Sequence, residues 1–293
     1  EYYDDLHQDE SVNFQLNRFL AYVGKDELDK FRSIGNKVSN FNEWKKEFLD
    51  LAEETLENGD KIRAGYYYRA AEFFMWNDDP KKQATREKFL QLVREGYGIT
   101  DEQHHLVHYK DENMEGYLPA YFFDHPEPKD TFVIMGGGDS YVEEWFPLFM
   151  GLNDQGYRFV VFEAPGQGGA LQEYNLPMTH EYHKAASAIL DHFGLEDVLL
   201  LAGTEDFGVP LDHFYKQIEA LKNVRSLTAR MFTREEQAQN HCQVGNIGLV
   251  LDVITNWIDL TLETQEKWDI RNSKKPNKGN SGNNDLVSSV HKN

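Results

Sequence analysis

Two glycine-rich segments near the middle of the chain have the composition of turns that bring backbone amides close to a ligand. GGGDS at 136–140 follows the apolar run 131–135, and PGQGG at 165–169 follows a second apolar run at 158–163. Short runs rich in β-branched and aromatic residues are typical of strands buried in a parallel sheet. Because ligands of open α/β sheets bind beyond the carboxyl ends of such strands, we expect both turns at a functional edge.

Two polar residues later in the chain could take part in proton transfer. Asp206 ends the segment GTED at 203–206, after a predicted strand at 197–202, and His241 lies in a loop after the predicted strand 226–232. Considered alone, each is an ordinary loop residue. A carboxylate that orients a histidine, and a histidine that takes a proton from a nucleophile, are the acid and base of a hydrolytic triad.

These motifs, taken in order, resemble one branch of the α/β-hydrolases. The matching segments are GGGDS, EAPGQGG at 163–169, GTEDFGVPL at 203–211 and NHCQVGN at 240–246. The branch contains bacterial esterase and acylaminoacyl-peptidase-like proteins and fungal hydrolases that shorten polyketide pigment precursors. The resemblance implies an α/β fold: a mostly parallel, α/β-hydrolase-like sheet preceded by an all-helical region. It also implies cleavage of an ester, amide or β-diketone bond in a small-molecule acyl substrate by an Asp-His-assisted serine.

The resemblance also assigns roles to individual residues. Asp206 matches the triad acid, and His241 matches the base that takes the proton of the nucleophile. Gly136, Gly137 and Gly138 match the loop that supplies an oxyanion donor, because glycine lets a backbone amide approach the developing charge. A tight strand-to-helix turn is the alternative interpretation of these glycines.

The nucleophile of the family has no counterpart in this sequence. No serine lies in Gly-x-Ser-x-Gly, the sharp turn that carries it. By comparison with the family, a large segment with the central strands is absent near residue 198. Its loss would leave a slot near 10 Å wide, or about two strand spacings. Either the two halves of the sheet pair directly, or an apolar edge stays exposed and invites a partner such as a second copy of the chain.

Whether the chain is an enzyme therefore stays open at the level of sequence. One alternative is that the sheet closes up and brings Ser140, after the glycine turn, near His241 as a substitute nucleophile. The other is a binding or scaffold protein, a pseudo-hydrolase that keeps the fold without catalysis. In the binding alternative, the exposed sheet edge makes a homodimer an expected assembly.

The elements that would position these residues are predicted from periodicity. Residues 1–100 form a helical region, 101–265 a hydrolase-like domain shortened near 198, and 266–293 a disordered tail with few apolar residues. We expect helices at 41–56, 61–76, 80–95, 141–152, 179–193 and 244–262. We expect strands at 104–109, 117–123, 131–135, 158–163, 197–202 and 226–232.

Neither a cofactor nor a metal is expected. A dinucleotide-binding loop would need a third glycine at the position of Leu171. His104 and His108 share a predicted strand face without a third ligand, and the two histidines at 180 and 183 are three apart, not four as in zinc proteases.

The composition limits the partners and the compartment. A formal net charge of −20 and a pI near 4.9 make nucleic acid and anionic membrane surfaces unsuitable partners. The only cysteine is Cys242, so no internal disulfide forms. We find no signal peptide and no apolar run of about eighteen residues, and we expect a cytoplasmic protein.

Overall fold

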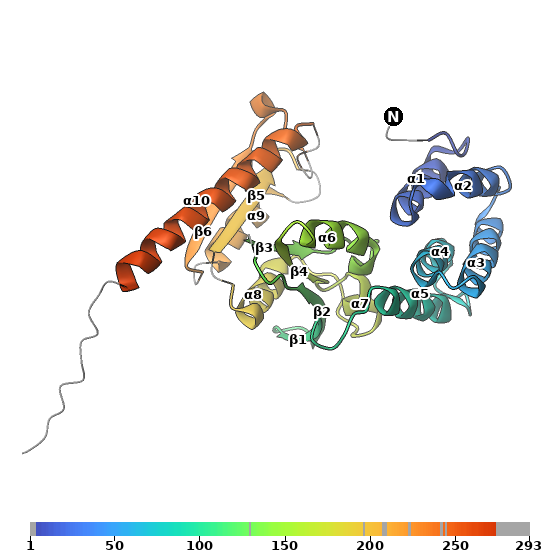
Figure 1. Ribbon diagram of the computed structural model, residues 1–293, viewed down its shortest axis with the longest axis horizontal. Coiled ribbons are helices and arrows are strands. Elements are labelled where there is room, and N and C mark those ends of the chain that lie inside the picture. Colours follow the sequence, from blue (N-terminus) through green and yellow to red (C-terminus); the bar gives the residue numbers. More distant parts are fainter. Residues whose placement is uncertain are drawn as a thin grey trace, which may run out of the picture. The chain divides into compact units, whose positions relative to one another are not determined.

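The structure is a computed structural model that divides into two compact units, Glu1–Leu195 and Glu196–Asn293 (Figure 1). Each unit is described by itself below. The described residues are 4–128, 130–195, 197–206, 210–221, 224–240, 243 and 245–273.

The first unit begins with the predicted helical region. Its elements are α1 (Glu10–Val23), η1 (Lys25–Glu27), α2 (Leu28–Gly35), α3 (Phe41–Glu57), α4 (Lys61–Phe73) and α5 (Lys82–Gly96). Helix α3 begins where Asn40 accepts hydrogen bonds from the backbone amides of Asn42 and Glu43, both at 3.0 Å. Helix α4 is buried on several faces, as its aromatic residues predict, and the indole of Trp44 donates to the Ala70 carbonyl at 2.7 Å.

A four-stranded sheet follows in the order β1-β2-β4-β3. Its strands are β1 (His104–Lys110), β2 (Glu115–Phe123), β3 (Asp130–Met135) and β4 (Tyr157–Phe162). Strands β1 and β2 pair antiparallel, as do β2 and β4, whereas β3 and β4 pair parallel with Val133 opposite Val160. The connection from β3 to β4 consists of η2 (Val142–Trp145) and α6 (Phe146–Asn153). The predicted parallel pairing of the third and fourth strands is therefore confirmed, and the predicted helix begins with a 3-10 turn.

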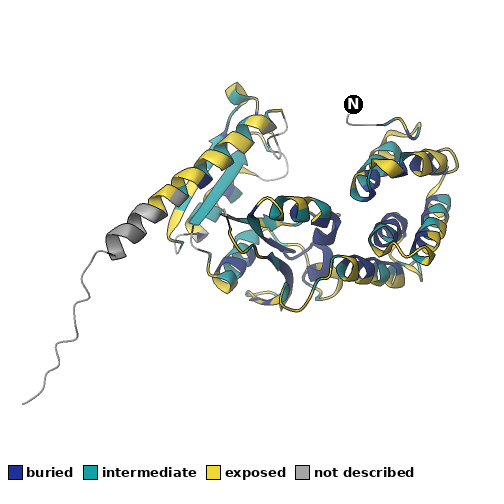
Figure 2. Ribbon diagram, in the orientation of Figure 1, coloured by how far each residue is buried: buried dark blue, intermediate teal, exposed yellow. Residues whose placement is uncertain are grey.

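One hydrophobic core joins the helical region to the sheet. It includes Phe19 and Tyr66 from the helices and Tyr121 and Phe159 from the strands. Buried stretches, dark blue in Figure 2, occur in both the helical region and the sheet. A second core covers the other face of the sheet, where α7 (Gly168–Gln172) and α8 (Tyr182–Phe193) lie. The sequence boundary at residue 100 is thus not a boundary in packing, because apolar side chains on both sides of it share one core.

The second unit contains a parallel strand pair with helices. Its elements are β5 (Asp197–Gly203), α9 (Leu211–Ala220), β6 (Ser226–Phe232), η3 (Arg234–Glu236) and α10 (Ile247–Ser273). Strand β6 has the predicted bounds. Helix α10 continues past residue 266, where the disordered tail was predicted to begin, so the first residues of that segment are helical. Residues 274–293 lie outside the described part.

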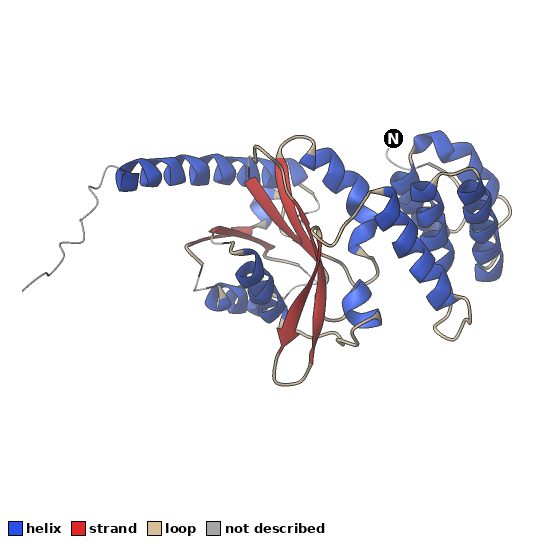
Figure 3. Cartoon of the chain, turned by 60° about the horizontal axis from the view of Figure 1, so that its bottom comes forward, coloured by secondary structure: helices blue, strands red, loops and turns tan. Residues whose placement is uncertain are grey.

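The described strands form two separate sheets, shown as red arrows in Figure 3. Within the described residues, no strand pairs with the outer edge of β3, and Val133 and Met135 are 39% and 41% exposed. No helix in the described part of the chain is long and apolar enough to cross a membrane.

Candidate functional site

The two glycine-rich turns lie together at the carboxyl ends of β3 and β4. The Gly136 amide donates to the Phe162 carbonyl at 2.8 Å, so the first turn begins on the last residue of β4. The side chain of Gln167 crosses between the turns: its Oε1 accepts from the Ala164 amide at 2.9 Å and lies 3.5 Å from where a Cβ on Gly136 would be. The predicted common edge is therefore confirmed.

Close packing accounts for the glycines of the second turn, and a dinucleotide-binding role is not needed to explain them. Gly166 has φ +86°, and a Cβ there would lie 2.6 Å from Met178 Cα. Gly168 has φ +28°, and its Cβ would lie 1.7 Å from Glu163 Oε1. Both positions exclude a side chain because the chain folds back on itself.

Glu163 is a buried carboxyl group between the two turns, and the sequence analysis gave it no role. Its Oε2 accepts from the Gly169 amide at 2.5 Å and its Oε1 from the Val142 amide at 3.2 Å. Burial, followed by the negative charge of Glu143, raises the pKa of Glu163 well above its ordinary value, although the two amides lower it. The carboxyl group therefore ties the second turn to the start of η2.

Glu143 is a second buried carboxylate at this edge. Its Oε1 accepts from the Tyr121 hydroxyl at 2.5 Å and from Arg94 Nη2 at 2.8 Å. Among the described residues, its Oε2 has no hydrogen-bond partner. The Tyr66 hydroxyl donates to the Glu143 carbonyl at 3.1 Å, so a helix of the helical region contacts the same residue.

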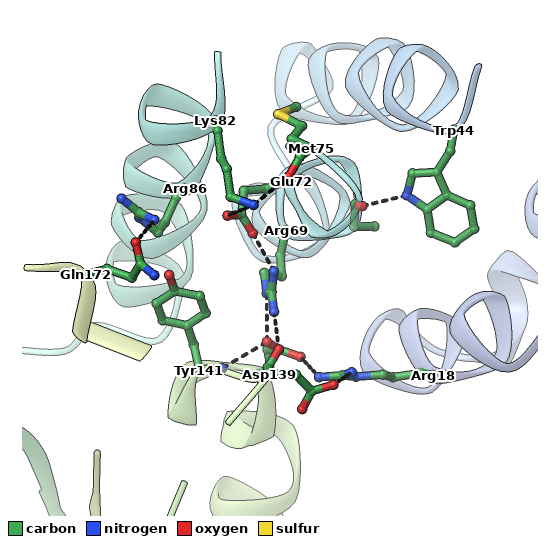
Figure 4. Close-up of polar contacts among 12 residues, drawn as sticks. Arg18, Trp44, Arg69, Glu72, Met75, Lys82, Arg86, Asp139, Tyr141 and Gln172 are labelled. Atoms are coloured by element: carbon green, nitrogen blue, oxygen red, sulfur yellow. Dashed lines mark hydrogen bonds and ion pairs between the residues drawn. The ribbon is translucent and has the colours of Figure 1, made fainter. Parts of the chain in front are cut away.

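Two arginines of the helical region reach the first turn (Figure 4). Arg69, in α4, donates to Glu144 Oε1 and to the Asp139 carbonyl, both at 2.7 Å, and also pairs with Glu72. Arg18, in α1, donates to Glu144 Oε2 at 2.9 Å and to Asp139 Oδ2 at 2.8 Å. Burial alone lowers the pKa of Arg69, but the carboxylates of Glu144 and Glu72 raise it by more.

Ser140 lies at the end of the first turn and is 6% exposed. Its Oγ would be 3.0 Å from a Cβ on Gly137, so the hydroxyl packs against its own turn. The histidine with which it was proposed to act, His241, lies outside the described residues. The role of Ser140 as a substitute nucleophile stays a prediction, as do the oxyanion roles of the three glycines.

In the second unit, the turn that carries Asp206 is hydrogen bonded to the segment ahead of His241. The Glu205 amide donates to the Gln239 carbonyl at 2.8 Å. A Cβ on Gly203 would lie 2.3 Å from that carbonyl oxygen, so only glycine allows this approach. Asp206 itself is half-buried. The chain positions next to the predicted acid and base are thus brought together.

The histidines of the sheet have ordinary structural surroundings. The ring of His104 stacks on Tyr121 with centroids 4.7 Å apart, and burial lowers the pKa of His104.

Within the described part of the chain, the only group of three side chains with metal-binding spacing is Asp111, Glu112 and Glu181. Lys184 Nζ already contacts Glu112 at 2.6 Å and Glu181 at 3.0 Å, so a lysine cation balances this exposed cluster.

Comparison with known proteins finds several fungal relatives. No protein-family model matches the sequence. The alpha/beta hydrolase xenA of Xenoacremonium sinensis is 27% identical over 204 residues, which cover 61% of this chain and 48% of that protein. The hydrolyase poxO of Penicillium oxalicum is 27% identical over 217 residues, with coverages of 62% and 49%. The solved structure titled AbyA5 Wildtype has a TM-score of 0.47 and 17% identity, and covers 66% of this chain and 56% of that one.

The chain is similar in sequence to fungal proteins named as α/β-hydrolases. The resemblance predicted from the motif order is thereby confirmed, and so is the fold class, since helices surround a mixed sheet. The chain spans about half the length of the curated relatives it matches.

Proposed function

We propose that this protein carries the acid and base of a serine hydrolase, with Asp206 holding the His241 imidazole and the turn at 136–138 supplying an oxyanion donor. The observation that carries the proposal is the 2.8 Å hydrogen bond from the Glu205 amide to the Gln239 carbonyl. It joins Glu205, which precedes the acid Asp206, to Gln239, which lies two positions before the base His241. The reaction would be cleavage of an ester, amide or β-diketone bond of a small acyl substrate.

The nucleophile is the part that this chain does not supply in the usual form. The match covers about half the length of the relatives. In the family that the motifs resemble, the serine turn lies between the helix matching α8 and the strand matching β5. In this chain α8 ends at Phe193 and β5 begins at Asp197. We therefore infer that acyl-enzyme formation needs a serine encoded between the codons for Val198 and Leu199, and sequencing of the gene there checks this directly.

The acid and base can be tested without turnover. We expect the Asp206→Asn variant to lower the pKa of His241 by about one unit or more, because the imidazolium loses its carboxylate partner. Nuclear magnetic resonance of histidine labelled at Cε1 follows the titration, and His241→Gln assigns the signal. Asp212→Asn, at an exposed position of α9, is the matched control. An unchanged His241 titration in Asp206→Asn would contradict the proposed pair.

The nucleophile is tested with a fluorophosphonate, which labels a serine activated by a working base. We expect no adduct by intact mass on the folded chain as it stands. An adduct that maps to Ser140 and disappears in Ser140→Ala would instead establish the substitute nucleophile.

A binding or scaffold role is the second candidate, and the position of β3 at the edge of the sheet in the first unit favours it. A strand edge with unpaired backbone groups and the exposed side chains Val133 and Met135 is suited to pairing with another strand. Light scattering after size exclusion gives the oligomeric state. A monomer at all concentrations would contradict dimerisation through this edge.

A further inference from the structure

Arg69 is a buried cation, and two of its three polar contacts lie at the edge of the sheet. The residue is 3% exposed and belongs to α4, in the helical region. Its Nη2 donates to the Asp139 backbone carbonyl, and its Nε donates to Glu144 Oε1. Burying a guanidinium is costly unless its donors are paired, and here Glu72 takes the remaining side of the fork. The contact to the Asp139 carbonyl is the one that reaches the backbone of the turn.

The same contacts hold the chain on both sides of Ser140. Glu144 Oε1 accepts from Arg69 and also from the Tyr141 amide at 2.9 Å, so one carboxylate oxygen links the guanidinium to the residue after Ser140. The carbonyl before Ser140 is held by Arg69 itself. A trans peptide is planar, with its carbonyl and its amide pointing in opposite directions. Fixing the Asp139 carbonyl therefore aims the Ser140 amide away from the arginine.

We propose that Arg69 is a positioning residue, which sets the orientation of the turn at 136–140 from the helical region. The proposal rests on the proposed function only for the use of that turn as an oxyanion donor. Arginine is required because a planar fork reaches a carboxylate and a carbonyl together, whereas a lysine is a point charge. The rings of Phe73 and Tyr141 lie 5.2 and 5.1 Å from the guanidinium carbon and confine its plane.

Amide-resolved hydrogen exchange of Arg69→Lys tests the proposal. The reporter is the Tyr141 amide, which shares its acceptor with Arg69, and the Gly136 amide reports the other end of the turn. We expect exchange of the Tyr141 amide to become about tenfold faster or more, as for the loss of a hydrogen bond to a charged group. Amides of β2 and β4 should keep their wild-type rates. Glycine-selective ¹⁵N spectra should show shifted signals for the glycines of this turn.

Arg63→Lys is the matched control, because Arg63 lies on the same helix and contacts Asp26, Glu27 and the Val23 carbonyl, all within the helical region. It should leave the Tyr141 amide unchanged. A Tyr141 rate that does not change in Arg69→Lys, or an increase that is uniform over the first unit, overturns the proposal. So does the same effect in Arg63→Lys.

A second measurement uses the wild-type chain and holds even if Arg69→Lys fails to fold. Exchange in low urea should show the Tyr141 amide opening with the same urea dependence as the amides of α4, since the proposal makes them one cooperative unit. A Tyr141 amide that opens with a smaller dependence while α4 stays closed overturns the proposal. Neither experiment uses His241. An unchanged His241 titration in Asp206→Asn would therefore contradict the proposed function and leave the role of Arg69 unaffected.

Discussion

Replacing Glu163 by glutamine should change how stability depends on pH. In the folded chain, burial and then the charge of Glu143 raise the pKa of Glu163 well above its ordinary value, and Glu173 adds to the rise. The amides of Gly169 and Val142 act in the opposite direction without reversing it. A carboxyl group with a raised folded-state pKa binds its proton more tightly in the folded chain than in the unfolded chain. Its stabilising effect is therefore complete below the unfolded pKa and is lost as the pH rises through the folded pKa.

The size of the effect follows from this linkage. Between the two pKa values the folded chain holds one proton that the unfolded chain lacks, so the wild type loses about 1.4 kcal/mol per pH unit. Glu163→Gln cannot titrate and avoids this loss. The free energy of unfolding of the variant minus that of the wild type should therefore increase by about 1.4 kcal/mol per pH unit above roughly pH 4.5. The increase should stop once the pH exceeds the pKa of Glu163 in the folded chain.

Urea denaturation of both proteins between about pH 5 and about pH 8 measures this difference. The slope is the quantity to compare, because glutamine offers one oxygen to two amides and carries a cost that does not vary with pH. Glu87→Gln, at an exposed position of α5, controls for the loss of one negative charge. Parallel curves for Glu163→Gln and the wild type would refute the reasoning, since they would mean that the carboxyl group ionises alike in both states.

Two further substitutions test the packing around the site and the helical region. Gly203→Ala would place a Cβ 2.3 Å from the Gln239 carbonyl oxygen and should destabilise the second unit by about 1–3 kcal/mol. Hydrogen exchange of β5 and β6 amides measures this, and unchanged protection would show that the two segments do not need to approach. Asn40→Ala removes the side chain that caps α3 and should lower the free energy of unfolding by about 1 kcal/mol. Urea denaturation followed by circular dichroism checks it, with Asn40→Asp expected to keep most of the stability.

Most elements of the fold follow from local patterns. The strand 226–232 has the predicted bounds because its apolar and β-branched residues are flanked by polar turns. Helix α3 was predicted at 41–56 and ends at Glu57, where Asn58 and Gly59 supply turn chemistry. Helix α4 ends at Phe73, earlier than the predicted residue 76, and Lys82 Nζ donates to the carbonyl of Met75, two residues beyond the helix, at 2.6 Å. That contact depends on a residue outside the helix and leaves no local pattern.

The buried charges at the sheet edge could not be predicted in this way. Glu143 and Glu144 have the pattern of acidic residues in the first turn of an exposed helix, and Arg69 that of a solvated face. Their partners lie far away in sequence: Arg69 and Glu144 are 75 positions apart. A charged residue is exposed by default, and only a partner supplied by the fold makes its burial possible.

The sequence by itself determined the superfamily, the order of helices and strands, and the two turns at the carboxyl ends of β3 and β4, because glycines and apolar runs act through local conformation. It also determined that no Gly-x-Ser-x-Gly turn is present. The tertiary structure decided that the helical region and the first sheet share one core, and that Arg69 and Glu163 hold the two turns. Those decisions depend on burial and on paired charges, which exist only after distant segments have packed together.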